Sequence, residues 1–309
     1  MALLYFSAWD DRGLWERELK ALDPTLDIRT LDNLGDAAEI DAALVWKPDQ
    51  GLLASLPNLK LIASLGMGVD HIFADPLLPK GVPIVRMVDD NLVDQMSEWV
   101  LLNVLRYHRA ADRYDADQSA QLWRPGYPPD TGARRIGVMG LGAIGLDAAT
   151  KLAKLGFAVA GWSRTLKHVP GIECHAGAAG FAAFLRRTEY LICLLPLTPE
   201  TDSIIDATLL AQLPKGAVVF NAARGGHVVE EDLLAALESG HLSAACLDVF
   251  RTEPLPKEHP FWRHPKVRMT PHNAGLTNPK TAAAQVIENL RRLRTGEPLR
   301  NLVGRERGY

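Results

Sequence analysis

The sequence predicts an α/β protein with parallel sheets. Short apolar strands alternate with helix-forming segments over residues 2–98, and the same alternation returns from residue 134 onward. A strand, a glycine-rich turn and a helix follow one another at residues 135–155, which is typical of a βαβ unit. Such alternation favours parallel sheets with helices on both faces. A chain of 309 residues is long enough for two such domains.

The first predicted domain begins at the first residue. Its strands are expected at residues 2–6, 42–46, 59–65 and 83–88, with a helix at 15–22 that stops before Pro24. A helix predicted at 277–294 is expected to return to this domain, which makes the domain discontinuous. We therefore predict two Rossmann-like domains, one comprising residues 1–98 with 277–309 and the other comprising residues 99–276.

The second predicted domain contains the glycine-rich turn. Continuous apolar runs predict buried strands, and segments of helix formers predict the helices between them. The expected strands are 135–138, 157–162, 190–196, 217–221, 244–249 and 267–270, and the expected helices are 146–155 and 230–237.

Residues 91–121 contain good helix formers and no glycine or proline, which predicts one long helix between the domains. It runs into a segment at 121–129 that is rich in aromatic residues and proline, here called the arm. Aromatic side chains outside periodic segments are candidate contacts for a partner subunit. Alternatively, these aromatics cover their own chain.

The turn at residues 140–145 reads Gly-Leu-Gly-Ala-Ile-Gly. In a dinucleotide site, the first glycine permits the tight turn, the second lets the backbone approach a pyrophosphate, and the third lets the helix pack on the strand. The pyrophosphate lies on N–H groups at the helix N-terminus, where the macrodipole favours an anion. Alternatively, this is a glycine-rich turn of another kind of α/β protein.

The residues after the next strand indicate which nucleotide binds. An acidic residue that bonds the adenosine ribose is expected about 20 residues after the turn, but the sequence there is Ser163, Arg164 and Thr165. Arginine and hydroxyl donors suit a 2′-phosphate, which a carboxylate would repel. The sequence therefore favours NADP(H) over NAD(H). Alternatively, Arg164 is only a solvated turn residue.

Three charged or titratable residues follow strand ends in the second domain, namely Arg224, Glu253 and His272. If the sheet is parallel, all three lie at the edge that carries the glycine turn. Carbonyl reduction needs such a set: an arginine holds a carboxylate and polarises a ketone, a protonated histidine supplies a proton, and a carboxylate orients the imidazole. Each residue alone also fits a loop or turn position, so only the joint pattern predicts catalysis.

Two strand ends of the first domain are also candidates for a ligand site. One ends at Trp46, and the other leads into Gly66, Met67 and Gly68, where successive N–H groups can form a nest for a carboxylate. Alternatively, this segment is a plain strand-to-helix turn.

Composition excludes several classes of protein. A net charge of −3 argues against a general nucleic-acid or membrane surface. The three cysteines have neither metal nor redox spacing, and we expect no metal site. Residues 1–10 lack the basic start and apolar core of a signal peptide, so a cytoplasmic enzyme is expected.

Taken together, these segments resemble the D-isomer-specific 2-hydroxyacid dehydrogenase family. The resemblance runs from the first strand to the C-terminus and is greatest to the glyoxylate/hydroxypyruvate reductase A group of that family. One departure is Asn273, where the family usually has an apolar residue. The segments that carry the resemblance are 45–48, 66–70, 140–145, 162–164, 195–201, 221–225, 247–250 with 253–254, 262–265, 271–272 and 307–309.

The resemblance implies roles for individual residues. Arg224 would bind the substrate carboxylate and carbonyl, His272 would be the acid–base residue, and Glu253 would pair with His272. The resemblance also implies a homodimer, with the arm around Trp123 reaching the partner subunit. The implied substrate-binding residues are Trp46, Met67, Gly68, Arg224 and His272. The implied cofactor-binding residues are Gly140, Gly142, Ala143, Ile144, Gly145, Ser163, Arg164, Thr165, Leu195, Pro196, Ala222 and Asp248, the last on the nicotinamide carboxamide.

The resulting hypothesis is NADPH-dependent reduction of a small 2-oxo acid, glyoxylate or hydroxypyruvate, to glycolate or D-glycerate. One alternative is a D-2-hydroxyacid dehydrogenase for another 2-oxo acid. Another is a non-enzymatic NAD(P)H-sensing binding protein. A methyltransferase fits poorly because it needs no Arg–Glu–His set, and NAD-dependent phosphoglycerate, formate or phosphite dehydrogenases fit poorly because of Ser163 and Arg164.

Overall fold

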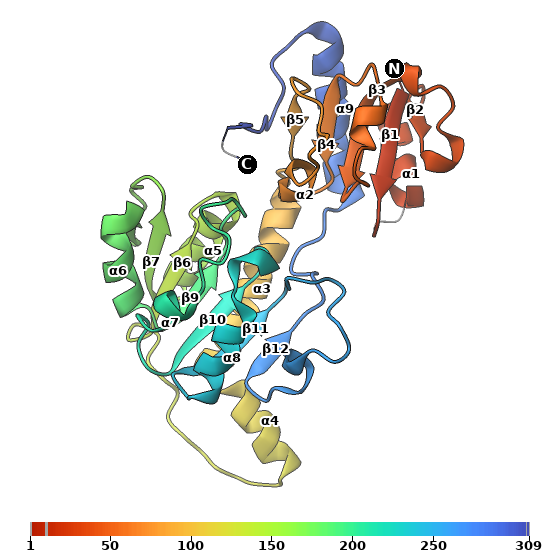
Figure 1. Cartoon of the computed structure of the whole chain (residues 1–309). Helices are drawn as coiled ribbons and strands as arrows, with labels where there is room; N and C mark the ends of the chain where they lie inside the picture. The colour runs from red at the N-terminus through yellow and green to blue at the C-terminus, as the bar shows by residue number, and fades with distance from the viewer. Residues whose placement is uncertain (1, 10–11, 307, 309) are drawn as a thin grey trace. The chain divides into compact units, whose positions relative to one another are not determined.

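The computed structural model describes residues 2–9, 12–306 and 308 and divides the chain into two compact units (Figure 1). The terminal unit comprises Met1–Leu92 and Leu276–Tyr309, and the central unit comprises Val93–Gly275. In each unit, the named strands form one sheet with parallel pairings. The predicted fold class, two Rossmann-like α/β domains of which one is discontinuous, is therefore confirmed.

The sheet of the terminal unit has the strand order β2-β1-β3-β4-β5. All four strands expected in this part of the chain are present with shifted ends. The additional strand, β2, was not predicted because it is a three-residue edge strand with charged residues at both ends. The strands are β1 (Ala2–Ser7), β2 (Asp27–Arg29), β3 (Ile40–Trp46), β4 (Leu61–Ser64) and β5 (Ile84–Val85).

The C-terminal helix α9 (Pro279–Thr295) belongs to the terminal unit, as the discontinuous domain requires. The Asn278 side chain accepts a hydrogen bond from the Lys280 N–H, and Gly296 ends the helix in the left-handed conformation. The helix packs beside α1 (Arg12–Leu22) in one apolar cluster. Its buried members from the two helices are Trp15, Leu19, Ala282, Ala283, Val286 and Leu290. Shorter helices of this unit are η1 (Leu31–Asn33), η2 (Ala37–Glu39), η3 (Leu53–Ser55) and α2 (Asp70–Phe73).

The sheet of the central unit has the strand order β12-β11-β10-β9-β6-β7-β8. The chain runs outward from β6 in one direction through β7 and β8, and in the other from β9 to β12. Ligands of such sheets bind at this reversal, outside the carboxyl ends of the strands. The strands are β6 (Arg135–Met139), β7 (Ala158–Ser163), β8 (Glu173–Ala176), β9 (Tyr190–Cys193), β10 (Ala217–Asn221), β11 (Leu242–Leu247) and β12 (Val267–Met269).

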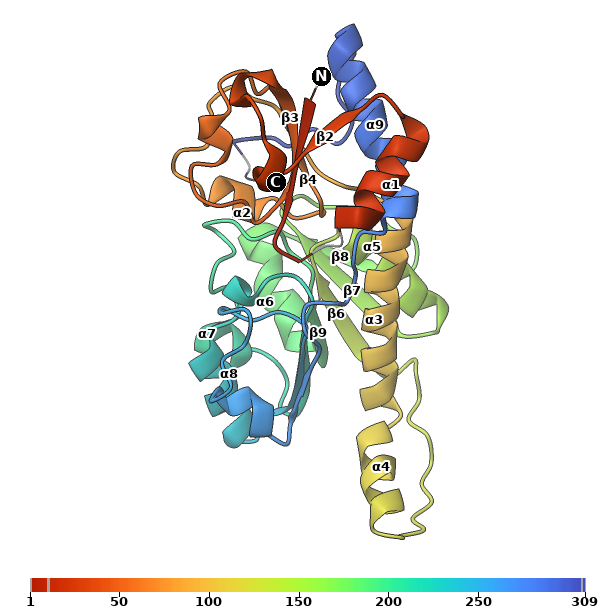
Figure 2. The same cartoon turned by 90° about the vertical axis from the view of Figure 1, so that its right-hand side faces the viewer.

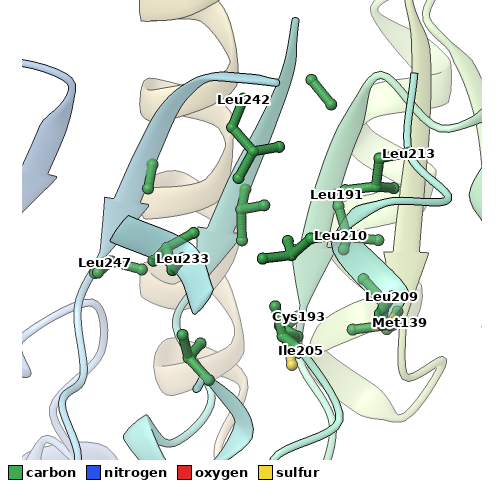
Figure 3. Close-up of a cluster of buried hydrophobic side chains, with 14 of the residues drawn as sticks. Met139, Leu191, Cys193, Ile205, Leu209, Leu210, Leu213, Leu233, Leu242 and Leu247 are labelled. Atoms are coloured by element: carbon green, nitrogen blue, oxygen red, sulfur yellow. The ribbon is translucent and has the colours of Figure 1, made fainter. Parts of the chain in front are cut away.

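Helices cover the central sheet and close its core. Figure 3 shows Leu210 of α7 (Ala207–Leu210) and Leu233 of α8 (Glu230–Glu238) among strand side chains such as Leu191 and Leu242, all in one buried cluster. Burying a leucine side chain contributes roughly 1.5–3 kcal/mol, so this cluster is a main source of the stability of the unit. The helices are α5 (Ala143–Lys154), α6 (Gly177–Arg187), α7 (Ala207–Leu210), η4 (Gly225–His227), α8 (Glu230–Glu238) and η5 (Pro260–Arg263).

The prediction of a single helix over residues 91–121 is wrong. The segment forms α3 (Asp90–His108) and α4 (Ala111–Ser119), and between them Ala110 has a left-handed backbone with φ of 53°. Alanine carries no sequence signal for that conformation. Arg106 spans the break and forms ion pairs with Asp112 and Asp115 of α4, so side-chain pairing favours the kink.

The arm after α4 has no regular secondary structure. The chain turns back at residue 121, and Arg124 pairs with the buried Asp117 carboxylate of α4. Figure 2 shows the extended segment beside α4. Trp123 is 94% exposed and Tyr127 is fully exposed. The side chains of Trp123 and Tyr127 therefore do not cover other described parts of their own chain.

The cysteines are free thiols. Cys193 and Cys246 are buried, and burial raises the pKa of each thiol to about 12, which disfavours the reactive thiolate. Across residues 2–9, 12–306 and 308, no group of histidine, cysteine and acidic side chains is suited to hold a metal ion. In the same residues, no helix has both the length and the apolar character to cross a membrane.

Candidate active site

The glycine turn links β6 to α5. Gly140 has φ of +97°, and a Cβ there would lie 2.7 Å from the Leu194 carbonyl oxygen. A Cβ at Gly145 would lie 1.7 Å from the Gly140 carbonyl oxygen, so only glycine permits this close turn. A Cβ at Gly142 would meet no heavy atom of the described chain within 4 Å. The space at Gly142 is therefore open to a ligand.

The first turn of α5 suits an anion. Gly142 is its N-cap residue and supplies no side-chain acceptor to the N–H groups that follow. Gly142 and Ala143 are exposed, and Ile144 is half-buried. Helix N-terminal N–H groups without a side-chain acceptor bind phosphate oxygens well, so this turn fits a pyrophosphate.

The predicted 2′-phosphate residues lie at the end of the neighbouring strand β7. Ser163 is the last residue of β7, and its hydroxyl donates to the Thr165 carbonyl oxygen at 2.8 Å. Arg164 and Thr165 are exposed. Lys167 donates to the Leu141 carbonyl oxygen, which ties this loop to the glycine turn. Lys167 was not among the predicted cofactor residues, because a single lysine in a loop carries no specific sequence signal.

His272 and Glu253 are in direct polar contact. His272 Nδ1 lies 2.8 Å from Glu253 Oε2, and both side chains are largely buried. The other carboxylate oxygen of Glu253 accepts the Phe250 N–H at 3.1 Å. A carboxylate only accepts hydrogen bonds, so Nδ1 carries the proton in this pair. Nε2 is then the ring nitrogen that can exchange a proton with a substrate.

Arg224 follows β10 on a constrained loop. Its carbonyl oxygen accepts from Asn221 Nδ2 at 2.9 Å and lies 3.0 Å from His227 Nδ1. A Cβ at Gly225 would lie 1.9 Å from the Phe250 carbonyl carbon, so the Arg224 loop packs tightly on the segment that leads to Glu253. The structure thus brings the loops of Arg224 and Glu253 together.

His227 was missed by sequence reasoning. It is fully buried, and its Nε2 lies 3.2 Å from the Pro196 carbonyl oxygen while its Nδ1 faces Arg224. It therefore connects the loop after β9 to the loop of Arg224. A histidine three residues after an arginine carries no sequence signal for this contact. Two other predicted cofactor residues nearby, Leu195 and Ala222, are buried after the ends of β9 and β10.

Asp248 follows β11 and is only 2% exposed. Its carboxylate accepts from the Thr270 hydroxyl at 2.5 Å and from the Asn273 and Ala274 N–H groups at 3.0 Å each. The Asn273 contact is made by its backbone N–H, and every residue except proline has this donor. The departure from the family at position 273 therefore leaves this bond unchanged.

The predicted substrate residues of the terminal unit lie at two neighbouring strand ends. Trp46 ends β3, and its ring lies 4.4 Å from the His71 ring. A Cβ at Gly66 would lie 2.6 Å from the Trp46 ring. Ser64 accepts the Gly66 N–H and donates to the Gly68 carbonyl oxygen, which closes the loop that carries Met67. Sequence reasoning missed Ser64 and His71.

The chain belongs to the D-isomer-specific 2-hydroxyacid dehydrogenase family. A family model described as the NAD binding domain of D-isomer specific 2-hydroxyacid dehydrogenase matches residues 101–274. The chain is 42% identical to proteins named glyoxylate/hydroxypyruvate reductase A from Yersinia enterocolitica and Serratia proteamaculans, with full coverage of both chains in each case. The family resemblance seen in the sequence is therefore confirmed.

Solved structures agree with this assignment. A D-isomer specific 2-hydroxyacid dehydrogenase from Xanthobacter autotrophicus Py2, in complex with NADPH and MES, is similar at 44% identity with a TM-score of 0.95, covering 100% of this chain and 99% of that chain. An NADPH-dependent glyoxylate/hydroxypyruvate reductase from Sinorhizobium meliloti, in complex with NADP and sulfate, is similar at 38% identity with a TM-score of 0.93 and the same coverage.

Proposed function

We propose that this chain reduces small 2-oxo acids with NADPH, converting glyoxylate to glycolate and hydroxypyruvate to D-glycerate. The observation that carries the proposal is the His272–Glu253 pair, which lies with Arg224 on loops after strands β10 to β12. These strands belong to the parallel sheet whose glycine turn follows β6. Relatives named glyoxylate/hydroxypyruvate reductase A, and a solved structure named as an NADPH-dependent glyoxylate/hydroxypyruvate reductase, support the same activity.

The residues of the central unit fit a dinucleotide. The open space at Gly142 and the N-terminus of α5 suit the pyrophosphate. Arginine and hydroxyl groups after β7 suit a 2′-phosphate, which supports NADP(H) over NAD(H). In this proposal, the residues that hold the cofactor are Gly140, Gly142, Ala143, Ile144, Gly145, Ser163, Arg164, Thr165, Leu195, Pro196, Ala222 and Asp248.

When bound, NADPH supplies a hydride to the carbonyl carbon. Arg224 holds the substrate carboxylate and polarises the carbonyl oxygen through its guanidinium. Protonated His272 donates its Nε2 proton to that oxygen, and Glu253 stabilises the imidazolium through Nδ1. One hydride and one proton added across the carbonyl bond give the hydroxy acid.

The remaining parts of the proposal concern the terminal unit and the assembly. We take residues 1–98 with 277–309 as the substrate domain and residues 99–276 as the dinucleotide domain. Trp46, Met67 and Gly68 are proposed to bind the substrate, which rests on their places at neighbouring strand ends. The homodimer through the arm and the cytoplasmic location stay predictions.

The first experiment measures oxidation of NADPH and of NADH with glyoxylate, hydroxypyruvate, pyruvate and phenylpyruvate. Fast NADPH oxidation with the first two substrates is expected. If the protein turns over only another oxo acid, that acid is the substrate and the proposed substrates are wrong. Tight NADPH binding without turnover on any of them would favour the sensing protein.

The same assay tests the cofactor preference through Arg164→Gln. A charge-assisted hydrogen bond contributes about 1.5–3 kcal/mol, so KM for NADPH should rise roughly 10- to 100-fold while KM for NADH stays nearly constant. Arg186→Gln is a matched control because Arg186 is an exposed arginine of the same unit on α6. An unmodified protein that prefers NADH would show that Arg164 is not a 2′-phosphate ligand.

A further inference from the structure

We propose that Trp99 and Thr270 are positioning residues for His272, acting through the buried Asp248 carboxylate. The inference rests on the proposed function, because it assigns these residues to the placement of the acid–base histidine. All four residues belong to the central unit. Neither Trp99 nor Thr270 has a part in the reaction as described above.

The direction of each hydrogen bond in this chain of contacts follows from the chemistry of the groups. Trp99 Nε1 lies 2.9 Å from Thr270 Oγ1, and an indole N–H can only donate. The Thr270 hydroxyl therefore accepts from Trp99 and uses its own hydrogen to donate to Asp248 Oδ1 at 2.5 Å. The tryptophan thus orients the hydroxyl toward the carboxylate.

Asp248 in turn holds three successive N–H groups of the loop that carries His272. Its carbonyl oxygen accepts the His272 N–H at 2.8 Å. Its carboxylate oxygens accept the Asn273 and Ala274 N–H groups. His272 has φ of 53°, in the left-handed region that non-glycine residues adopt at an energetic cost. These bonds to Asp248 offset that cost.

Two anchors therefore place the imidazole. Glu253 holds the ring through Nδ1, and Asp248 holds the backbone from which the ring projects. The ring alone cannot fix Nε2 in space if the backbone at His272 can rotate. Misplacement of a reacting group by about 1 Å can lower a rate about 100-fold, so the backbone anchor matters for proton transfer.

Burial makes the Thr270 hydroxyl hard to replace. Asp248 is 2% exposed and Trp99 is 7% exposed, so water has little access to either partner. A buried carboxylate depends on its donors because its charge is otherwise poorly solvated. A carboxylate has about four lone-pair sites, and three are used here. The fourth lone-pair site can still accept a hydrogen bond from a carboxamide. The hydrogen bonds to Thr270, Asn273 and Ala274 are therefore compatible with the cofactor role proposed for Asp248.

The test compares Thr270→Val with Thr270→Ser. Valine keeps the shape of threonine but removes the hydroxyl, whereas serine keeps the hydroxyl. In NADPH-dependent glyoxylate reduction, kcat of Thr270→Val should fall roughly 10- to 100-fold. Thr270→Ser should stay within about threefold of the unmodified protein, since it rescues the contact that valine removes. KM for glyoxylate should change little in both variants.

Two readouts separate positioning from general destabilisation. Hydrogen exchange of the Asn273 and Ala274 amides should become faster in Thr270→Val than in Thr270→Ser, in protein without cofactor. NADPH affinity, measured by fluorescence, should stay within about threefold in both, because the remaining donors still hold Asp248. Trp99→Phe should also lower kcat and speed exchange, and it should add little when combined with Thr270→Val.

Several outcomes would overturn the inference. The inference is wrong if Thr270→Val has the same kcat as the unmodified protein. It is also wrong if Thr270→Val and Thr270→Ser lose kcat equally. If Thr270→Val does not fold, Trp99→Phe takes its place as the test. Unchanged kcat and unchanged amide exchange in Trp99→Phe would then overturn the inference. An unmodified protein without activity on 2-oxo acids would defeat the proposed function, while the amide exchange would still test the contact between Thr270 and the loop.

Discussion

At the scale of single residues, the site is built from contacts between residues far apart in the sequence. His272 and Glu253 are 19 positions apart, and Trp99 and Thr270 are 171 positions apart. The left-handed backbone at His272 is stabilised by a neighbouring strand end rather than by its own sequence. The polar chemistry of the site therefore depends on the packing of β11 and β12.

His272→Ala tests the acid–base assignment. General acid catalysis contributes typically 10²- to 10⁴-fold, so kcat should fall by roughly that factor. NADPH affinity measured by fluorescence should be nearly unchanged, since no cofactor contact is assigned to the imidazole. Glu253→Gln should lower kcat less, because an amide can still accept from Nδ1 but no longer stabilises the imidazolium.

His264→Gln is the control for this pair of variants. His264 follows η5, outside the predicted catalytic set, and it accepts a hydrogen bond from the Lys266 N–H that glutamine can also accept. Its kcat should equal that of the unmodified protein. Normal turnover by His272→Ala would contradict the assignment of the acid.

At the scale of elements, the turn between β6 and α5 contains glycines that are present for two different reasons. Gly145 is required by the fold, because a Cβ at this position would clash with the Gly140 carbonyl oxygen. Gly142 has ordinary φ of −74° and open space around it, so nothing in the fold requires glycine there. A ligand approaching the backbone is the reason that remains.

The two glycines therefore predict opposite results on substitution by alanine. Gly145→Ala should lower Tm sharply, because its Cβ would lie 1.7 Å from a carbonyl oxygen. Gly142→Ala should cost at most about 1 kcal/mol of stability at the helix N-cap but weaken NADPH binding. Thermal melts and NADPH titrations measure both. Normal NADPH affinity in Gly142→Ala would argue against a pyrophosphate at this turn.

Helix α9 carries an exposed ion-pair network with a predictable pH dependence. Hydrogen bonds from Arg291 are the largest cause that lowers the pKa of Glu288 and of Glu297 to about 2, well below the usual value of about 4.5 for a glutamate. Because the folded-state pKa lies below the unfolded-state pKa, this stabilisation is present above about pH 4.5 and is lost as the pH falls toward 2.

Arg291→Gln tests this network. Its Tm should lie below that of the unmodified protein at about pH 6, and the difference should shrink at about pH 3 and in high salt, which screens exposed charges. Arg17→Gln is the control, because Arg17 pairs only with the adjacent Glu18 in the contacts described. A Tm difference that does not vary with pH would contradict the electrostatic origin.

At the scale of the whole molecule, the most exposed large hydrophobic side chains among residues 2–9, 12–306 and 308 are in the arm. Trp123 and Tyr127 project from a segment that Arg124 ties to Asp117 of α4. Exposed aromatic groups on an anchored segment suit an interface, since tryptophan and tyrosine are enriched at interfaces and bury large areas. This supports the predicted homodimer.

Light scattering after size exclusion tests the dimer. The unmodified protein should be a dimer, and the double variant Trp123→Ala with Tyr127→Ala should shift toward monomer at the same concentration, because truncating interface aromatics costs binding energy. Trp262→Ala is the control, as this half-exposed tryptophan of η5 lies outside the arm. A monomeric unmodified protein would contradict the prediction.

Elements with strong apolar patterns could be predicted from the sequence. The strand expected at residues 217–221 coincides with β10, because five buried apolar or amide residues fit only a central strand. Edge strands β2 and β8 were not predicted, since short half-exposed strands lack such a pattern. The break at Ala110 was missed because ion pairs made after folding select its backbone conformation.

The sequence by itself determined the fold class, the family and the types of residue at the site. Periodic burial and the glycine turn are local properties, and motif residues can be read in order along the chain. Only the tertiary structure decided that Nδ1 of His272 meets Glu253 and that Asp248, Thr270 and Trp99 support the histidine loop. The physical reason is that hydrogen bonds act over about 3 Å, and the folded sheet alone brings such distant residues within that range.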